Sequence, residues 1–252
     1  MKANWEKLRR GEPMYGCFVS TGSTVAVEVM GSAGFDFLVI DLEHGMSSER
    51  DILPQLQAMQ HTAALGCVRV ESHERQRVHR ALDFGAQGIM FPRVDTAEQA
   101  RACVAALRYP PGGVRGVAVL VRGSQYGARF AEYQAEADAQ LMPMLQIETA
   151  EAVAHVDEIA AVEGDGVLFV GPMDLTTSMG IFRQYDHPGF TAALRKTVEA
   201  ARRNGKPAGI LVPKAADTKR YLDMGFTFLM CGTDLAFLQS AAKSTAEAMR
   251  KA

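Results

Sequence analysis

The sequence lacks long apolar runs and closely spaced cysteines. No segment approaches the ~18 consecutive apolar residues of a membrane-spanning helix, and the stretch MKANWEKLRRGEP has no apolar core of the kind that secretory signals carry. The four cysteines (Cys17, Cys67, Cys103 and Cys231) form no CxxC pair, which argues against a zinc cluster and for reduced thiols. We therefore expect a cytoplasmic protein with no membrane partner.

The sequence also has little excess charge and no familiar nucleophile motif. Its 27 Lys and Arg residues face 29 Asp and Glu residues, for a formal net charge of −2. Without a broad basic field, nucleic acid is not an expected partner. There is no Gly-x-Ser-x-Gly elbow, and no predicted strand ends in a nucleophilic cysteine. Covalent acyl chemistry is therefore poorly supported.

What the sequence does contain is a regular alternation of short apolar runs with helical patterns. The runs are YGCFVS (15–20), FDFLVIDL (35–42), LGCVRV (65–70), AQGIMFPRV (86–94), LMPMLQIE (141–148), DGVLFVG (165–171), PAGILVP (207–213) and FTFLMCG (226–232). Strand–helix alternation indicates βαβ units and a parallel sheet. Eight units in 252 residues match a closed (β/α)8 TIM barrel. A doubly wound sheet of eight strands is the alternative.

No linker or change of composition divides the chain, so we expect a single barrel domain over residues 1–252. Gly34, Gly85 and Gly225 each stand between a helical pattern and a strand, where a left-handed residue often ends a helix. Residues 109–129 interrupt the alternation of strands and helices, because this Gly- and Arg-rich segment has no helical period. Long loops inside compact domains are usually functional or interfacial, although a solvated excursion is the alternative.

If the fold is a barrel, polar residues at the carboxyl ends of the strands are the candidates for a site, because barrel active sites are built there. These residues are Asp41, Glu43, His44, Arg69, Glu71, Arg93, Asp95, Gln146, Glu148, Asp174, Lys214 and Asp234. The set is predominantly acidic. It favours chemistry that uses carboxylates over chemistry that uses a covalent nucleophile.

Within this set, Gln146 and Glu148 share parity on one predicted strand, so both side chains point to the same face, which is the interior in a barrel. A buried carboxylate must be paired, protonated or bound to a metal. Asp174 ends the next strand, in VLFVGPMDL, and a divalent cation between the two carboxylates would offset their repulsion. The alternatives are a pair between Glu148 and Arg69 or Arg93, and a helix N-cap role for Asp174.

His44, in DLEHG, follows a buried strand and is a candidate general base, because histidine commonly fills that role. The other five histidines fall on helical stretches or turns, where packing or solvated roles are expected. Asp83, in RALDFGAQG, lies near the end of a helical stretch. By itself it reads as a solvent-facing helix residue.

Several motifs together resemble one family. They are IDLEHG, VRV, ALDFGAQGIMFPRVDTAEQA, RYPPGGVRG, LQIET, VEGDGVLFVGPMDL and GKPAGIL, in order from about residue 14 to beyond residue 235. Together they resemble the metal-dependent (class II) pyruvate aldolases of the HpcH/HpaI family. The resemblance implies a barrel whose last helix is exchanged between subunits and a homohexamer. It also implies reversible aldol addition of pyruvate to an aldehyde, with a divalent cation as cofactor.

The resemblance assigns the metal and substrate residues by motif. The metal-binding carboxylates fall on Glu148 of LQIET and Asp174 of GPMDL, and Gln146 matches the glutamine that binds pyruvate. Backbone N–H groups at Met173 and Asp174 match the contacts to substrate. Family members often have Ala or Ser where this chain has Met173, so the bulkier side chain is expected to reshape the pocket without removing these contacts.

The resemblance also assigns the catalytic residues. His44 matches the catalytic base, Asp83 of ALDFGA matches the acid that raises its basicity, and Arg69 of VRV matches the arginine that stabilises the transition state. This implied role replaces the solvent-facing interpretation of Asp83. Arg93 departs from the less charged residue expected there and could bind an anionic acceptor.

The implied function is reversible cleavage of 4-hydroxy-2-oxo acids to pyruvate, or hydroxypyruvate, and an aldehyde, with Mg²⁺, Mn²⁺ or Co²⁺. A metal-dependent acyl-CoA thioester lyase on a related barrel is an alternative, which should carry a basic groove for the coenzyme. A non-catalytic binding barrel is a second alternative, but it would not need His44, Arg69, Glu148 and Asp174 together.

Overall fold

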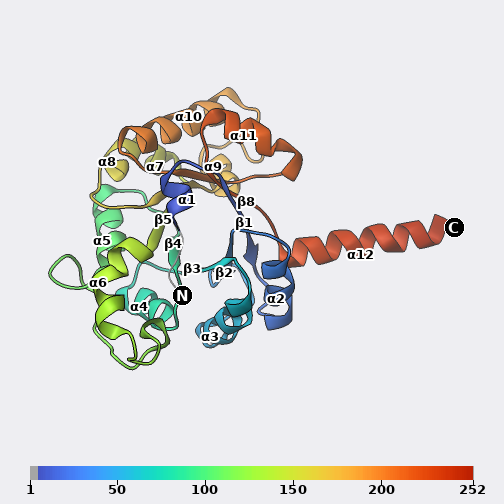
Figure 1. Cartoon of the computed structure of the whole chain (residues 1–252). Coiled ribbons are helices and arrows are strands. Elements are labelled where there is room, and N and C mark those ends of the chain that lie inside the picture. Colours follow the sequence, from blue (N-terminus) through green and yellow to red (C-terminus); the bar gives the residue numbers. More distant parts are fainter. Residues whose placement is uncertain (1–4, 252) are drawn as a thin grey trace.

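The protein, described by a computed structural model over residues 5–251, is a closed barrel of eight parallel strands (Figure 1). The strands are β1 Met14–Val19, β2 Phe37–Asp41, β3 Leu65–Arg69, β4 Gly88–Phe91, β5 Met142–Ile147, β6 Val167–Val170, β7 Ala208–Leu211 and β8 Phe228–Thr233. Each strand pairs with its sequence neighbours, and β8 closes the circle on β1. The predicted (β/α)8 barrel is confirmed and the doubly wound sheet is wrong. The first four residues and the last residue of the predicted domain, 1–252, lie outside the described part.

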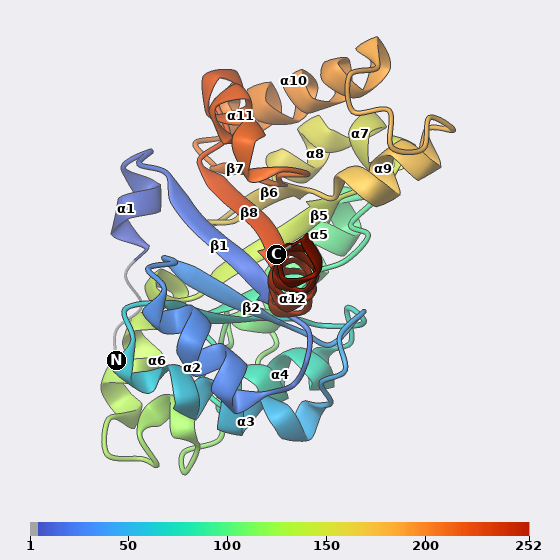
Figure 2. The same cartoon turned by 90° about the vertical axis from the view of Figure 1, so that its right-hand side faces the viewer.

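Helices connect the strands and surround the barrel (Figures 1 and 2). They are α1 Glu6–Arg9, α2 Thr24–Ser32, α3 Glu49–Ala58, α4 Arg75–Asp83, α5 Ala97–Leu107, α6 Phe130–Gln140, α7 Ala150–Ala154, α8 Val156–Ala160, α9 Pro172–Ser178, α10 Pro188–Arg203, α11 Thr218–Met224 and α12 Asp234–Lys251. Gly34, Gly85 and Gly225 have φ angles of 95°, 96° and 104°. Their predicted left-handed conformation is confirmed.

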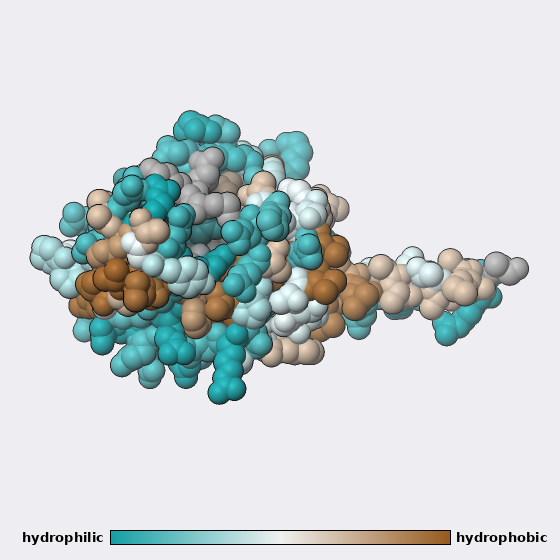
Figure 3. All heavy atoms as spheres, turned by 60° about the horizontal axis from the view of Figure 1, so that its bottom comes forward, coloured by the Kyte–Doolittle hydropathy of each residue, from teal (hydrophilic) through white to brown (hydrophobic). Residues whose placement is uncertain are grey.

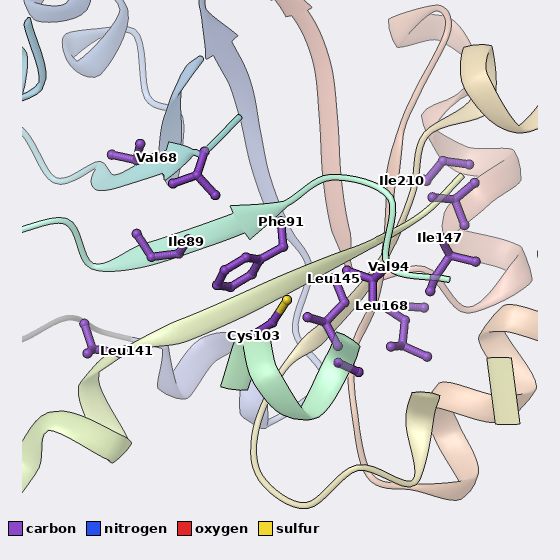
Figure 4. Packing of buried hydrophobic residues seen from close by; sticks show 14 of the residues in the cluster. Val68, Ile89, Phe91, Val94, Cys103, Leu141, Leu145, Ile147, Leu168 and Ile210 are labelled. Carbon is purple, nitrogen blue, oxygen red and sulfur yellow. The ribbon is translucent and has the colours of Figure 1, made fainter. Parts of the chain in front are cut away.

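The apolar runs are continuous because each strand is buried on both faces. Outward residues such as Ile89, Phe91 and Leu145 pack against the surrounding helices, with Cys103 of α5 among them (Figure 4). Inward residues form a second cluster that fills the barrel. Full burial of one such side chain contributes about 1.5–3 kcal/mol, so the two layers supply most of the driving force for closure.

The lower end of the barrel, where the amino ends of the strands lie, is closed by apolar side chains. Trp5 and Leu8, at and within α1, belong to the inner cluster. The indole N–H of Trp5 donates to the carbonyl oxygens of Gln87 (3.2 Å) and Gln140 (3.1 Å). Because the interior is filled at this end, a small molecule could enter only from the upper end, where the carboxyl ends of the strands lie.

Helix α12 differs from the others because it projects away from the barrel (Figures 1 and 2). Its beginning contacts β1, β8 and α2. Leu235, Phe237, Leu238 and Met249 are exposed along it, and apolar residues gather where it leaves the barrel (Figure 3). Among the helices of residues 5–251, none is long and apolar enough to cross a membrane.

Candidate active site

Strand β5 delivers two polar side chains to the upper end of the barrel interior. Met142, Met144 and Gln146 alternate inward, and Glu148 follows with the same parity just after the strand ends. Gln146 and Glu148 are buried, with 2% and 3% of their surfaces exposed. The placement predicted from parity is therefore confirmed.

Glu148 is held in place by two donors. Its Oε1 accepts from the backbone N–H of Arg93 at 2.7 Å, and its Oε2 accepts from Nε2 of Gln146 at 2.7 Å. Gly171 lies so close that a Cβ atom there would stand 2.6 Å from Oε2. A larger residue at this position would have to displace the carboxylate from where it lies. Within residues 5–251, neither Arg69 nor Arg93 forms an ion pair with Glu148, so that predicted alternative is wrong.

Burial raises the pKa of Glu148 to about 7, because desolvation penalises the charged form. The carboxylates of Asp174 and Glu43 raise it further, whereas the N–H of Arg93 and the charge of Arg69 oppose the rise. Burial and the neighbouring acids thus favour the protonated form of Glu148. A bound cation would favour its charged form.

Asp174 lies at the mouth of the barrel, on the first turn of α9. Strand β6 ends at Val170, Gly171 is the N-cap, and Pro172 is the first helical residue. The N-cap role considered for Asp174 is therefore wrong. Asp174 is exposed and close enough to raise the pKa of Glu148. Met173 beside it is 42% exposed.

The donor set fits a hard divalent cation. Glu148 and Asp174 supply two carboxylates, and Oε1 of Gln146 is a buried acceptor with no hydrogen-bond partner in the described structure. Oxygen ligands of this kind, completed by water, suit Mg²⁺ or Mn²⁺. Residues 5–251 contain no cluster of three or more His, Cys, Asp or Glu residues that could hold a metal. Substrate and water would have to complete the coordination.

Arg69 ends β3 beside Asp41 of β2, because the register pairs these two residues. Its Nε and Nη2 donate to the two oxygens of Asp41 at 2.9 and 2.8 Å, and its Nη1 lies 2.9 Å from Oε2 of Glu43. The guanidinium also lies 4.4 Å from the centre of the Phe18 ring. Bidentate pairing and stacking give this buried positive charge one fixed orientation.

His44 lies in the loop after β2, with its side chain 66% exposed. Its backbone N–H donates to Oδ1 of Asp41 at 3.2 Å, and its Nε2 stands 3.9 Å from Oε2 of Glu43. Asp41 therefore ties His44 and Arg69 together. Asp41 and Glu43 were among the strand-end candidates predicted from the sequence, but neither had a predicted role, because their partners depend on the register between strands.

Asp83 is the last residue of α4, and its carboxylate lies 3.8 Å from Nη2 of Arg115. Burial raises the pKa of Asp83, and Arg115 opposes that rise. The helix runs antiparallel to the strands, so Asp83 lies at the lower end while His44 lies at the upper end. One chain does not bring the two predicted partners together. The solvent-facing interpretation also fails, because the Asp83 side chain is only 24% exposed.

The segment 109–129 packs against α4 and α6. Arg115 from this segment is fully buried between the rings of Tyr109 and Tyr133, at 4.6 and 5.1 Å from their centres. Its Nη2 donates to the hydroxyl of Tyr133 at 2.8 Å. The segment is thus anchored, and the alternative of a solvated excursion is wrong for this part of it.

The chain is similar to known proteins in both sequence and fold. The sequence profile of the family described as HpcH/HpaI aldolase/citrate lyase matches residues 14–241. The chain is 39% identical over 236 residues to 5-keto-4-deoxy-D-glucarate aldolase of Klebsiella pneumoniae, which covers 94% of this chain and 92% of that protein.

Solved structures give the same result. A HpcH/HpaI aldolase/citrate lyase family protein from Burkholderia cenocepacia superposes with a TM-score of 0.92 at 36% identity, covering 97% of this chain and 98% of that one. The HpcH/HpaI aldolase from Desulfitobacterium hafniense superposes with a TM-score of 0.93 at 29% identity, covering 100% of this chain and 98% of that one. The chain therefore belongs to the HpcH/HpaI aldolase/citrate lyase family.

Proposed function

We propose that this protein is a class II aldolase that cleaves 4-hydroxy-2-oxo acids reversibly to pyruvate, or hydroxypyruvate, and an aldehyde. Family membership and aldolase relatives across most of the chain make it a carbon–carbon lyase. The observation that carries the proposal is the buried Glu148, with a pKa raised to about 7, beside Asp174 and an unpartnered amide oxygen of Gln146.

Glu148 and Asp174 would hold Mg²⁺, Mn²⁺ or Co²⁺. When bound, the cation supplies Lewis acidity to the carboxylate and keto oxygens of the 2-oxo acid and so stabilises the enolate. The two carboxylates follow consecutive strands, Glu148 directly after β5 and Asp174 on the helical turn after β6, and their mutual repulsion decreases when a cation lies between them. The hydrogen bonds that Glu148 accepts from Arg93 and Gln146 orient its carboxylate for this role.

Gln146, Met173 and Asp174 would bind the pyruvate portion. The first turn of α9 leaves backbone N–H groups of Met173 and Asp174 without acceptors inside the helix, and such groups favour an anion. The pyruvate carboxylate is the anion that fits. Only the backbone is needed, so Met173 can fill a position where a smaller side chain is usual in the family.

Arg69 would stabilise the enolate oxygen as negative charge develops there. Its orientation is set by Asp41 and Glu43 before substrate arrives, so no reorganisation is needed during the reaction. His44 would take the proton from the 4-hydroxyl group during cleavage and return it during synthesis. In cleavage the C3–C4 bond breaks, its electron pair goes to C3, and the former hydroxyl carbon becomes the aldehyde.

Asp83 can raise the basicity of His44 only from a second copy of the chain, since the two lie at opposite ends of one barrel. An assembly is supported by α12, which leaves the barrel with Leu235, Phe237 and Leu238 exposed. We propose that this helix is exchanged between subunits and that the protein forms a homohexamer. Sedimentation of the full chain and of a chain ending at residue 233 would test the role of α12 in assembly.

The function is tested by assaying pyruvate release from 4-hydroxy-2-oxo acids before and after treatment with a chelator. Activity should be lost on exhaustive metal removal and return with Mg²⁺, Mn²⁺ or Co²⁺. Full activity in the metal-free enzyme would contradict the proposal. A panel of aldehydes assayed with pyruvate, with detection of the product, would then identify the preferred acceptor.

A further inference from the structure

A cleft of about 460 Å³ opens beside the proposed active site, at the upper ends of β3 and β4. Two of its lining residues reach the site directly. Glu43 contacts Arg69 at 2.9 Å, and the backbone N–H of Arg93 donates to Glu148 at 2.7 Å. A molecule in this cleft is therefore next to both the enolate-stabilising arginine and a proposed metal ligand.

Arg93 has an unusual backbone and a side chain with no partner. Its φ angle is 50°, in the left-handed region that residues other than glycine rarely adopt. That conformation directs its N–H to Glu148. Its exposed guanidinium makes no hydrogen bond, ion pair or ring contact with any residue in the described range. Strained backbone of this kind gathers at functional sites.

The acidic residues of the cleft do not neutralise Arg93. Glu43 is engaged by Arg69 at 2.9 Å, and Glu71 is engaged by Nε of Arg77 at 3.0 Å. Glu74 is the N-cap residue of α4, where the positive end of the helix offsets its carboxylate. Arg93 is thus the cation of this lining that is available to a ligand.

We propose that Arg93 is a specificity-determining residue that binds a carboxylate on the acceptor aldehyde. In the cleavage direction, the same contact holds the distal carboxylate of a 4-hydroxy-2-oxo dicarboxylic acid. That group takes no part in bond breaking and leaves unchanged with the aldehyde. A guanidinium binds a carboxylate through two parallel hydrogen bonds, which gives orientation as well as affinity. The inference rests on the proposed aldolase function, and it adds the residue that selects the acceptor.

The test compares kcat/KM for charged and neutral acceptors of equal length, with Mn²⁺-loaded enzyme and saturating pyruvate. The pairs are glyoxylate with glycolaldehyde, and succinic semialdehyde with butanal. The wild type should prefer the carboxylated member of at least one pair. In Arg93→Asn and Arg93→Gly, that preference should fall roughly 10- to 100-fold, the range for losing a hydrogen bond to a charged group, while the neutral members change little. Asparagine and glycine both tolerate a positive φ angle, so the N–H to Glu148 is kept.

Arg183 provides a matched control. It is also an exposed arginine with a positive φ angle of 58°, and it lies in the loop after α9, outside the residues that line the cleft. Arg183→Asn should leave the preference unchanged. An equal fall in both variants would overturn the assignment, as would a preference that survives in both Arg93 variants or a wild type that favours neutral acceptors.

Failure of the proposal can be separated from failure of the proposed function. Exchange of the pyruvate methyl protons in D2O, followed by NMR without any aldehyde, reports enolate formation alone. If the wild type and the Arg93 variants exchange equally but acceptor preference does not respond to Arg93, only the acceptor assignment is lost. If the Mn²⁺-loaded wild type does not exchange protons at all, the aldolase function itself is contradicted.

Discussion

The protein buries an arginine near each end of the barrel, and the two are held in different ways. At the upper end, Arg69 is bound by two carboxylates with contacts of 2.8–2.9 Å. At the lower end, Arg115 stacks between two tyrosine rings, with Asp83 at 3.8 Å. Its Nε and Nη1 have no hydrogen-bond partner within residues 5–251.

The different surroundings of the two arginines indicate different roles, one in the proposed reaction and one in holding the fold. Arg69 is oriented by its carboxylate partners and is one of the groups that shift the pKa of Glu148, which is the surrounding that its proposed role requires. Arg115 joins the segment 109–129 to α4 and α6, far from the strand ends that carry the site. We propose that the buried charge at the upper end serves the reaction, whereas the one at the lower end fixes a long loop.

The largest effect should come from the proposed metal ligands. Glu148→Gln and Asp174→Asn each remove a charged oxygen ligand, and the Lewis acidity that depends on them contributes several kcal/mol to the transition state. We therefore expect kcat to fall by at least about 10³-fold. Calorimetric titration with Mn²⁺ should show weak or absent binding in both variants. Either variant with metal affinity equal to the wild type would remove that residue from the ligand set.

Substitution of the two arginines sharpens the comparison most directly. Arg69→Ala should lower kcat roughly 10²–10³-fold, as expected for loss of an electrostatic donor at an oxyanion, with Mn²⁺ affinity retained. Arg115→Met should instead lower the Tm, because the half-buried Asp83 loses its cation. Thermal unfolding and Mn²⁺ titration of both variants provide the measurement. If Arg69→Ala is as fast as the wild type, its proposed role is wrong.

Mixing two inactive variants tests whether Asp83 acts across subunits. His44→Ala and Asp83→Asn should each reduce kcat/KM, and co-refolded mixtures should recover up to about a quarter of wild-type activity, because half of the sites in mixed pairs regain both residues. Recovery after mixing is not expected if both residues act within one chain. If mixed oligomers form and no activity returns, Asp83 serves only to anchor Arg115.

The smallest effect concerns stability of the metal-free protein. The folded pKa of Glu148 is raised from 4.5 to about 7, so folding favours its protonated form. The stability that this group contributes is complete below pH 4.5 and is lost as pH rises through about 7, by about 3 kcal/mol at most. Metal-free Glu148→Gln should therefore match the wild type near pH 5 and have a Tm several degrees higher at pH 8. If the difference in Tm between the wild type and Glu148→Gln does not change over this pH range, folding does not raise the pKa of Glu148.

The fold was predictable because its signals are local. Parallel strands covered on both faces require continuous apolar runs, and each run became a strand within a few residues of its predicted limits. The parity of Gln146 and Glu148 fixed their direction for the same reason. The resemblance pointed to residues at the ends of several strands, and the structure brings Asp174 and Arg69 close enough to Glu148 to shift its pKa.

What the sequence could not show depends on contacts between distant elements. The pairing of Arg69 with Asp41 follows from the register of β2 and β3, which has no signature in either strand. The hydrogen bond from the Arg93 N–H to Glu148 depends on a left-handed backbone conformation at Arg93, which the sequence FPRVD does not predict. Asp83 was assigned to His44 by motif alone. The direction of α4 puts the two at opposite ends of one chain.

The single tryptophan of the sequence lies in the apolar plug at the lower end. Trp5 has no exposed surface and is hydrogen-bonded to two carbonyl oxygens. Its fluorescence therefore reports whether the bottom of the barrel is closed, and it is insulated from events at the strand ends. Substrate and cation do not contact this indole, so its emission gives an unfolding signal that they do not perturb directly. Any change in the melting curve of Trp5 emission on adding Mn²⁺ therefore measures coupling between the two ends of the barrel.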